Sequence, residues 1–379
     1  MKILFVCNEY PPFPFGGLGV FVKALGKALS SISGVEVYVL CMRDDISERN
    51  DIKDGNLNLI QYPLKNLRLK RLNMFYKALQ QNRIIKSISK EKQIDIVEIS
   101  SSENFYLLNY NYGAKLVVRT HGSIMYAIHN ESRAYIGRLQ KYFKLRHEKQ
   151  IYKSADAIIT ISTKFHKWFS EKYGDKVIFV PNFLQDNFVR ISAGKSNFDR
   201  PYIFHHGTLK EDKGTFDLVN AFFKSSLYKT HYLVLAGKIS EKDRIRLESL
   251  QATKVLSIGV LNNDELKDYL VNADFSIYPS RRDAFNLCVI ESMSQECLTV
   301  VSDVIDEGII KDHKSGIRRK INDEFDVLRL IEDVILLPAS RRKEIKQHGR
   351  AHVIEKFAPD VIIRNNLDLY QKISNNNSK

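Results

Sequence analysis

The sequence predicts an α/β protein of two domains, each a parallel β-sheet covered by helices. Short β-branched or apolar runs recur along the chain at intervals that leave room for a helix, a rhythm typical of parallel sheets. With 379 residues the chain is longer than the roughly 250 residues at which a single hydrophobic core stops growing. A polar, structure-breaking stretch at 192–201 separates two series of such runs. We therefore expect the same Rossmann-like architecture to be used twice.

The apolar runs give each series its expected strands. The first series has runs at 3–7, 35–40, 95–99, 116–119, 157–161 and 177–180. The second has runs at 202–206, 232–236, 255–258, 275–278 and 298–301. Apolar residues at helical spacing predict a helix near the start of each series, at 20–29 and 217–223, and a last helix at 360–373. Both domains thus begin as strand, loop and helix.

Composition excludes several classes of protein. Hydrophobic residues make up 44% and charged residues 27%, as in soluble globular proteins, so a disordered chain or a membrane bundle does not fit. The N-terminal apolar run ends before Asn8 and is shorter than the about 7 to 15 residues of a secretory signal. No run approaches the roughly 18 apolar residues of a membrane span. We expect the protein in the cytoplasm.

The cysteines indicate no metal or redox chemistry, whereas the net charge indicates anionic partners. Cys7, Cys41, Cys288 and Cys297 lie in apolar or helical segments without CxxC spacing, so we expect reduced core thiols. The formal net charge of +14 favours anionic partners, among them nucleotide diphosphates, phospholipid headgroups and nucleic acid. Charge alone does not choose among these partners.

A glycine cluster follows the first expected strand. A proline-stiffened turn leads to Gly16 and Gly17 at the start of the helix expected at 20–29. Glycine lets backbone amides approach a phosphate closely, and a helix N-terminus favours an anion. The cluster lacks the GxGxxG spacing of dinucleotide-binding proteins, so a plain tight turn remains the alternative.

A lysine occupies the corresponding place in the second domain. Lys213 and Gly214 stand directly before the helix expected at 217–223. An ammonium group there would meet diphosphate oxygens as a point charge, while Gly214 eases the backbone turn. The alternative is a solvated surface lysine.

The segment at 278–293 carries the most chemistry. A strand ends at a proline, a loop carries Asp283, and a helix begins near Phe285, Asn286 and Leu287, whose free amides suit a pyrophosphate group. Glu291 follows Asp283 by eight positions, so two carboxylates could accept hydrogen bonds from a sugar and from a ribose. The alternatives are an ordinary acidic residue near a helix start for Asp283 and a solvent-facing helix residue for Glu291.

Together these segments resemble the retaining nucleotide-sugar glycosyltransferases of the GT-B architecture (glycosyltransferase family 4-like, glycosyl transferases group 1). The resemblance covers nearly the whole chain. It rests on Tyr10-Pro11-Pro12, Gly16-Gly17, Thr120-His121-Gly122, Ser154-Ala155-Asp156, Val180-Pro181-Asn182, Gly207 with Lys213-Gly214, and the segment from Asp283 to Glu291. It implies two Rossmann-like domains that face each other across a cleft. These are an acceptor domain at 1–190, on which a helix at 358–379 packs back, and a donor domain at 191–357.

The resemblance also implies roles for individual residues. Glu291 would bind the donor ribose, Asp283 would stand where a glutamate touches the transferred sugar, and Lys213 would bind the diphosphate. His121 would lie near the donor sugar, although a lone histidine is more often structural. His121, Asp283 and Glu291 are therefore the expected catalytic group. The amides of 285–287 and the Gly16-Gly17 turn would complete the phosphate cradle.

Two positions depart from the family pattern. Asp283 replaces the usual glutamate, which moves the carboxylate by about 1.5 Å. Thr208 replaces the usual arginine after Gly207, so one phosphate cation is missing. Our hypothesis is that Lys210 or Arg282 supplies that charge to the donor. The departures leave a catalytically degenerate nucleotide-sugar-binding module as the alternative to an enzyme.

The resemblance implies transfer of a hexose-type sugar from a UDP- or GDP-sugar, with retention and without a metal. The sequence agrees on the metal, since it has no DxD motif or histidine cluster at a strand end. The acceptor is expected to be a saccharide or a lipid-linked saccharide, in bacterial lipopolysaccharide or capsule synthesis.

Two basic stretches with interleaved aromatic residues add the hypothesis of a peripheral position on an anionic membrane face. The alternative for these stretches is a solvated helix face. They consist of Lys65, Arg68, Lys70, Arg71, Lys77 with Tyr76, and of Arg138, Lys141, Lys144, Arg146, Lys149 with Tyr142 and Phe143. A nucleic-acid partner is not expected, since no recognised binding motif accompanies the charge.

Overall fold

The computed structural model describes residues 1–11, 17–67, 70–101, 111–130, 138–192, 194, 198–250, 253–283 and 285–375. The chain divides into two compact units. Unit 1 consists of Met1–Pro181 together with the C-terminal residues from Ile363 on, and unit 2 is Asn182–Ile362. The residues after Pro181 belong to unit 2 because Leu184 and Phe188 are buried in its core. Each unit is an α/β domain, which confirms the predicted fold class.

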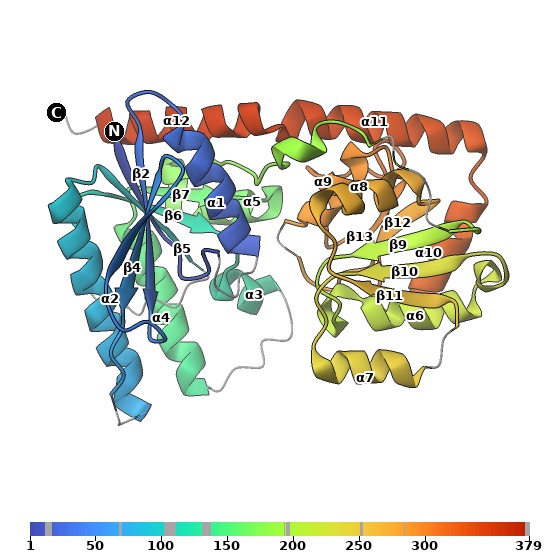
Figure 1. Cartoon of the computed structure of the whole chain (residues 1–379), viewed down its shortest axis with the longest axis horizontal. Coiled ribbons are helices and arrows are strands. Elements are labelled where there is room, and N and C mark those ends of the chain that lie inside the picture. The colour runs from blue at the N-terminus through green and yellow to red at the C-terminus, as the bar shows by residue number, and fades with distance from the viewer. Residues whose placement is uncertain are drawn as a thin grey trace. The chain divides into compact units, whose positions relative to one another are not determined.

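Unit 1 contains one sheet with the strand order β3-β4-β2-β1-β5-β6-β7-β8. All neighbouring strands are parallel except β3 and β4, which form an antiparallel hairpin at the edge. The strands are β1 (Lys2–Val6), β2 (Glu36–Arg43), β3 (Asn50–Asp54), β4 (Leu57–Pro63), β5 (Ile96–Ser100), β6 (Lys115–Thr120), β7 (Ala157–Thr160) and β8 (Val177–Phe179). The helices are α1 (Gly17–Ser30), α2 (Lys70–Lys92), α3 (Ile124–Asn130), α4 (Arg138–Ser154), α5 (Thr163–Tyr173) and α12 (Pro359–Asn375), the last of which starts in unit 2 (Figure 1).

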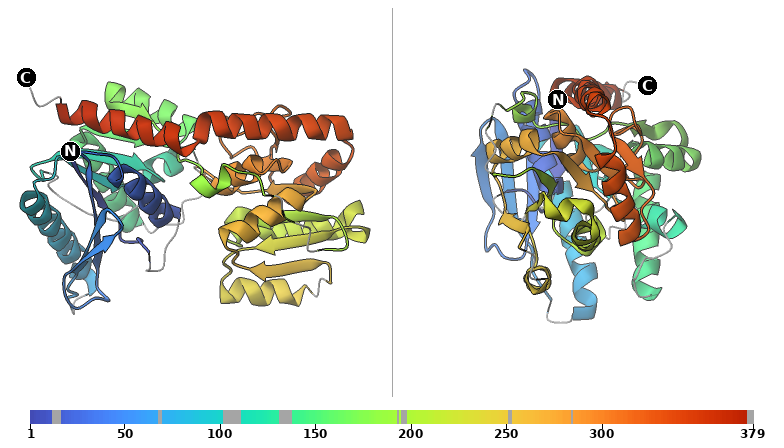
Figure 2. Two further views of the ribbon diagram at one scale, coloured as in Figure 1. Left: turned by 45° about the horizontal axis from the view of Figure 1, so that its top comes forward. Right: turned by 90° about the vertical axis from the view of Figure 1, so that its right-hand side faces the viewer.

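Unit 2 contains a parallel sheet with the strand order β11-β10-β9-β12-β13-β14. The strands are β9 (Tyr202–His206), β10 (Tyr232–Ala236), β11 (Val255–Gly259), β12 (Phe275–Tyr278), β13 (Thr299–Ser302) and β14 (Ile317–Arg319). The helices are α6 (Thr215–Lys224), α7 (Glu241–Ser249), α8 (Asn263–Asn272), α9 (Leu287–Ser294), α10 (Glu324–Ile335) and α11 (Ala339–Phe357). The strands of this unit lie between helical layers (Figure 2).

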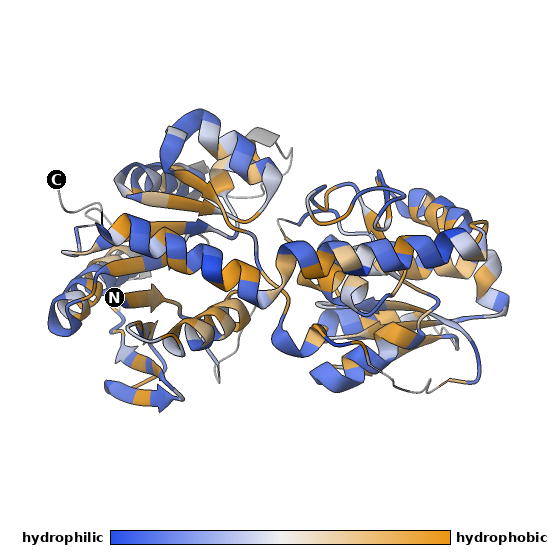
Figure 3. Ribbon diagram, turned by 90° about the horizontal axis from the view of Figure 1, so that it is seen from above, coloured by the Kyte–Doolittle hydropathy of each residue, from blue (hydrophilic) through white to orange (hydrophobic). Residues whose placement is uncertain are grey.

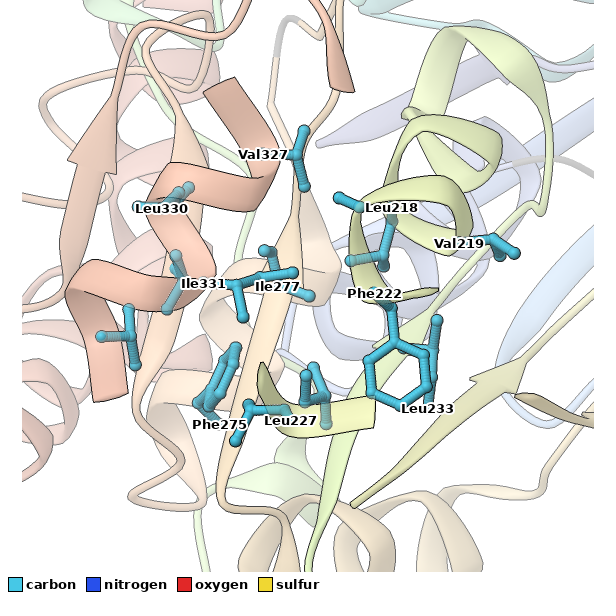
Figure 4. Packing of buried hydrophobic residues seen from close by; sticks show 14 of the residues in the cluster. Leu218, Val219, Phe222, Leu227, Leu233, Phe275, Ile277, Val327, Leu330 and Ile331 are labelled. Carbon is cyan, nitrogen blue, oxygen red and sulfur yellow. The ribbon is translucent and has the colours of Figure 1, made fainter. Parts of the chain in front are cut away.

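Alternation of side chains gives the unit 2 sheet two buried faces, as a doubly wound fold requires. On β10, Leu233 and Leu235 face a core that includes residues of α6 and α10, whereas Val234 and Ala236 face a core that includes residues of α8, α9 and α11. Figure 4 shows the first core, in which side chains of α6 and α10 meet those of β12. The strands seen in Figure 3 are largely orange, whereas exposed helix faces carry much blue.

The positions of the expected strands and helices are confirmed to within a few residues. Three further strands, β3, β4 and β14, were not among those expected. β3 carries the polar sequence NDIKD and is mostly exposed, and β14 has only three residues, so neither presents a clear apolar run. No helix in the described part of the chain is long and apolar enough to cross a membrane.

Candidate functional site

The order of strands marks one edge of the unit 2 sheet as a ligand site. β9 lies between β10 and β12, so the chain continues to one side after β9 and to the other side after β12. In open α/β sheets, ligands bind beyond the carboxyl ends of the strands at such a switch point. The loop after β9 carries Lys213, and the loop after β12 carries Asp283. Topology therefore brings two predicted site residues to one place.

Lys213 and Asp283 form an ion pair at this edge. The lysine Nζ lies 2.6 Å from the aspartate Oδ2. The Lys213 side chain is 29% exposed and that of Asp283 is 9% exposed. Lys213 is thus no solvated surface lysine, and its charge is held beside a nearly buried carboxylate.

Gly214 allows the two loops to approach this closely. Its φ is +72°, a left-handed conformation that glycine adopts without strain. A Cβ built on Gly214 would lie 2.1 Å from the carbonyl oxygen of Pro279. The amide of Arg281 donates to the carbonyl of Asp212 over 2.9 Å, which joins the loops further. Glycine is therefore required at 214 by space as well as by conformation.

Glu291 projects from α9 toward the end of β9. Its Oε2 lies 3.1 Å from Nε2 of His206, the last residue of β9. On the other side of the ring, Nδ1 lies 2.7 Å from the hydroxyl of Tyr278, which also bonds Ser292. Glu291 is only 13% exposed, so it is not a solvent-facing helix residue.

His206 carries a positive charge in this arrangement. Burial lowers its pKa, but Cys288 and Glu291 outweigh burial and raise the pKa of His206 to about 9. The protonated ring donates to Glu291, and such charge-assisted hydrogen bonds are roughly twice as strong as neutral ones. The carboxylate is therefore held in one orientation before any ligand arrives.

The start of α9 presents backbone donors to the same edge. Asn286 caps the helix, because its side chain accepts a hydrogen bond from the amide of Cys288 over 3.0 Å. Within the described part of the chain no hydrogen bond is found from the amides of Phe285, Asn286 and Leu287. The ring of Phe285 packs edge-on against Phe357, which fixes this turn in the unit 2 core.

Lys210 and Arg282, the two candidates for the missing arginine charge, differ in whether an acidic residue neutralises them. Thr208 and Lys210 are exposed, and the Lys210 side chain makes no hydrogen bond or ion pair with any described residue. Arg282 instead bonds both carboxylate oxygens of Asp212 over 3.0 Å. Of the two candidate replacements, Lys210 has the uncompensated charge.

In unit 1, His121 follows β6 directly. Its Nε2 is buried and has no hydrogen-bond partner among the residues that the structure describes. Burial, helped by the nearby Arg119 charge, lowers the pKa of His121 to about 3, so the ring is neutral. Its edge contacts Phe21 of α1 with ring centroids 5.2 Å apart. A neutral imidazole with a free nitrogen can bond one hydroxyl group of a ligand.

Arg119 precedes His121 on β6 and is fixed by a buried network. Its guanidinium donates to Glu98 on β5 over 2.7 Å and to Asn366 on α12 over 2.6 Å. The Tyr370 hydroxyl, also on α12, donates to Glu98 over 2.6 Å. Arg119 also lies over the Phe21 ring, 4.9 Å from its centroid. The C-terminal helix is thereby tied to the strand that leads to His121.

The glycine turn of unit 1 is described only in part. Gly17 is the first residue of α1, is exposed, and has open space around it. Gly16 lies outside the described residues. The predicted role of this turn stays a prediction.

The two basic stretches of unit 1 lie mainly on α2 and α4; Lys65 precedes α2, and Arg68 lies outside the described residues. Phe75 of α2 contacts Phe143 of α4, with ring centroids 5.8 Å apart. Phe75 is 42% exposed and Tyr142 is 57% exposed. Lys77 is paired with Asp44 over 2.6 Å, whereas the described part of the structure gives Lys141 and Lys144 no ion pair.

Two residues of the site were missed by sequence reasoning. All four cysteines were expected in the core. Cys7, Cys41 and Cys297 are buried there, whereas Cys288 is partly buried against the core and lies beside Glu291. His206 was treated only as part of a strand. Their positions in the sequence could have indicated them. His206 is the last residue of the expected strand at 202–206, and Cys288 lies three residues before Glu291 on α9. Helical residues three apart share a face.

The fold defines a protein of two Rossmann-like units, and comparison with known proteins gives its family. Two family models match the chain, Glycosyltransferase Family 4 over residues 15–187 and Glycosyl transferases group 1 over residues 190–352. The chain belongs to the GT-B glycosyltransferases.

Relatives and solved structures agree with this assignment. An uncharacterised glycosyltransferase of Bacillus subtilis, YqgM, is 23% identical over 100% of this chain and 99% of its own length. Sucrose-phosphate synthase from Thermosynechococcus elongatus has the same fold, with a TM-score of 0.81, 18% identity and 98% of each chain covered. A structure of Anabaena HepE in complex with UDP and glucose gives a TM-score of 0.72 at 12% identity, covering 98% of this chain and 100% of that one.

Proposed function

We propose that this glycosyltransferase moves a hexose-type sugar from a nucleotide-diphosphate sugar, with retention of configuration, to a saccharide or lipid-linked saccharide. The Lys213–Asp283 pair at the switch point of unit 2 carries the proposal. A cation, a carboxylate and the start of a helix meet there, and a sugar diphosphate needs all three.

In this proposal the donor separates Lys213 from Asp283 and binds to both side chains. Diphosphate oxygens take the place of Asp283 beside Lys213, since an ammonium group binds phosphate as a point charge. The released Asp283 carboxylate then accepts hydrogen bonds from hydroxyls of the sugar. Glu291, already oriented by His206, accepts hydrogen bonds from the ribose.

Bond cleavage leaves negative charge on the diphosphate. Lys213 and the amides of 285–287 stabilise this charge without reorganising, which is the largest contribution in many enzymes. The neutral His121 bonds a hydroxyl of the sugar, and the acceptor hydroxyl attacks from the face that the diphosphate leaves. We propose that the reaction needs no metal, because these groups supply the stabilisation.

We propose UDP as the nucleotide to test first. The related Anabaena structure was solved with UDP and glucose, which supports a UDP-sugar donor for this chain. GDP-sugars remain the second choice. A role in bacterial surface polysaccharide synthesis, of lipopolysaccharide or capsule, is part of the same proposal.

Calorimetric titration of UDP, GDP and ADP, and of their sugar conjugates, tests the donor site. We expect one nucleotide to bind the native chain and Glu291→Ala to weaken that binding by about 10-fold or more, the cost of a charged hydrogen bond. Glu355→Ala is the matched control, because Glu355 is 67% exposed on α11. Equal binding by native chain and Glu291→Ala would remove the ribose assignment.

A transfer assay separates the enzyme from the degenerate module suggested by Asp283 and Thr208. A module would bind the nucleotide sugar yet neither transfer nor hydrolyse the sugar. An enzyme would release nucleotide from the native chain and lose that release in Asp283→Asn. Binding without turnover under every acceptor tried would favour the module.

We propose that Lys210 supplies the cation that Thr208 lacks. Its exposed side chain is unpaired among the described residues, whereas Arg282 is held by Asp212. Lys210→Ala should weaken UDP binding by about 3- to 10-fold, in line with a partly exposed charge contact. Arg282→Ala should have less effect. Unchanged affinity in both variants contradicts the hypothesis.

We further propose that unit 1 rests on an anionic membrane face, as a peripheral cytoplasmic protein. Exposed Phe75 and Tyr142 stand among the lysines of α2 and α4, a combination typical of interfacial binding. Each basic residue near such a surface contributes about 1 kcal/mol. The double variant Lys141→Glu/Lys144→Glu should release the chain from anionic liposomes at low salt, and Lys242→Glu on α7 should not. Failure of the native chain to co-sediment contradicts the proposal.

A further inference from the structure

Three side chains with metal-binding atoms meet beside the donor site. His206 ends β9, while Cys288 and Glu291 project from the same face of α9. The imidazole nitrogen, the thiol sulfur and a carboxylate oxygen all lie within 4.8 Å of one another. Ligand atoms of a tetrahedral zinc ion stand roughly 3.5 Å apart, given bond lengths of about 2.0 to 2.3 Å. Small side-chain movements would therefore close the group around one ion.

The nitrogen, sulfur and oxygen atoms of this group favour one kind of metal ion over others. Thiolate and imidazole prefer borderline-soft ions such as Zn²⁺, whereas Mg²⁺ and Ca²⁺ prefer oxygen ligands alone. Three protein ligands leave one tetrahedral position for water or an anion. The group is thus suited to Zn²⁺ and poorly suited to Mg²⁺.

Surrounding residues hold the ligands in place. The Tyr278 hydroxyl lies 2.7 Å from Nδ1 of His206 and leaves Nε2 facing Glu291. Such hydrogen bonds to the second ring nitrogen orient metal-binding histidines. Gly207 leaves space at the sulfur, because a Cβ there would lie only 3.1 Å from the Cys288 Sγ.

We propose that His206, Cys288 and Glu291 form a Zn²⁺ site whose occupation inhibits donor binding. Binding of Zn²⁺ releases the proton on Nε2 of His206 and the thiol proton of Cys288 to solvent, since metal ligands are deprotonated. Bound metal takes the Glu291 carboxylate that the ribose needs, so metal and nucleotide exclude each other. The inhibitory role rests on the proposed function of Glu291, whereas the metal site itself does not. The site is not a catalytic metal centre, since filling it removes a substrate contact.

The test begins with metal alone, using the full chain. Co²⁺, a spectroscopic substitute for Zn²⁺, should give a thiolate-to-cobalt absorption band that Zn²⁺ displaces. Cys288→Ser and His206→Gln should abolish the band. His348→Gln is the matched control, because His348 is 52% exposed on α11 and its loss should leave the band unchanged. Since His206 is buried, circular dichroism verifies that its variant folds, and Cys288→Ser carries the conclusion where it does not.

The second part measures competition with UDP. With Zn²⁺ at 100 times its dissociation constant, exclusive binding lowers the apparent UDP affinity of the native chain by about 100-fold. Cys288→Ser should keep its UDP affinity in Zn²⁺, and Mg²⁺ should have no effect on either protein.

The outcomes separate the two proposals. A missing thiolate band, or Zn²⁺ binding that Cys288→Ser leaves intact, overturns the metal site. Zn²⁺ and UDP bound together overturn the inhibition. If the metal-free chain binds Zn²⁺ as expected but no nucleotide, the metal site is upheld and the donor function, with the inhibitory role, is lost.

Discussion

The two units hold the charged residues in and after their strands in opposite ways. In unit 1, Arg119 and Glu98 are 1% and 4% exposed and bond each other and α12. In unit 2, Lys213 and Arg282 are 29% and 49% exposed and stand in ion pairs near open backbone donors. The first network forms its main bonds without a ligand, although Nη1 of Arg119 has no hydrogen-bond partner among the described residues. The second can exchange its partners.

This difference separates a structural role for charge from a binding role. A buried, hydrogen-bonded ion pair holds elements together, and its loss of partners to a ligand would cost free energy. The Lys213–Asp283 pair can exchange one partner for phosphate, because phosphate oxygens replace the charged bond that Lys213 gives up. Under the proposed function, the charges of unit 2 are those that a diphosphate can engage, whereas the described end of β6 in unit 1 presents a neutral His121.

The largest effect expected from this comparison is on the stability of unit 1. Arg119→Met leaves the Glu98 carboxylate buried beside the Tyr370 hydroxyl alone. Removal of one partner of a buried pair costs about 3 to 5 kcal/mol. Urea unfolding followed by fluorescence of Trp168, the single tryptophan of the chain, reports on unit 1.

The control for this variant is an exposed arginine of the same unit. Arg49 bridges Asp51 and Glu91 and is 34% exposed. Arg49→Met should cost about 0 to 1 kcal/mol, as surface pairs do. Equal losses of unfolding free energy in the two variants would show that the buried network stabilises unit 1 no more than an exposed ion pair does.

The second effect concerns the loop that carries Lys213. Gly214→Ala forces a side chain into a left-handed backbone, at about 1 to 2 kcal/mol, and against the Pro279 carbonyl, at about 1 to 3 kcal/mol more. Gly259→Ala has a similar φ of +77° but open space, so it should show only the backbone cost. Thermal unfolding of unit 2 by circular dichroism compares the variants, and a Gly214→Ala no less stable than Gly259→Ala would contradict the close approach.

How far the site could be predicted depends on what sequence spacing encodes. The apolar runs predicted most strands of both sheets, because buried strands are made of apolar residues. β3 is mostly exposed and polar, so it presents no such run. Lys213 and Asp283 stood at expected loop positions, yet their ion pair depends on Gly214 and on the neighbouring register of β9 and β12. The contact between His206 and Glu291 joins residues 85 positions apart, so no local pattern announces it.

The third effect tests whether the partly exposed pair exchanges partners. Lys213→Ala should weaken UDP binding by about 10- to 100-fold, the value of one charge-assisted hydrogen bond. UMP, with one phosphate fewer, should lose less. Lys224→Ala is the control, because Lys224 is 46% exposed on α6 and paired with Glu324. Equal losses for UDP and UMP would show that Lys213 acts on the fold and not on the diphosphate.

The smallest effect concerns the neutral His121 of unit 1. Its pKa is lowered to about 3 in the folded chain, below the value of about 6.5 for an unfolded histidine. Between these values the unfolded chain binds more protons, so stability falls as the pH falls through this window. From about pH 6.5 to about pH 5.5 the native chain should lose about 1 kcal/mol more than His121→Gln does.

The same fluorescence of Trp168 in urea measures this difference at each pH. The pKa values of His147 and His205 are also lowered, to about 4, but both residues are present in each protein and cancel in the comparison. His348→Gln removes an exposed histidine and should keep the native pH dependence. An identical pH dependence for native chain and His121→Gln would mean that His121 takes up its proton in the folded state. The ring would then titrate near the ordinary pKa of about 6.5 and be charged only below that pH. Burial would in that case not be what keeps His121 neutral.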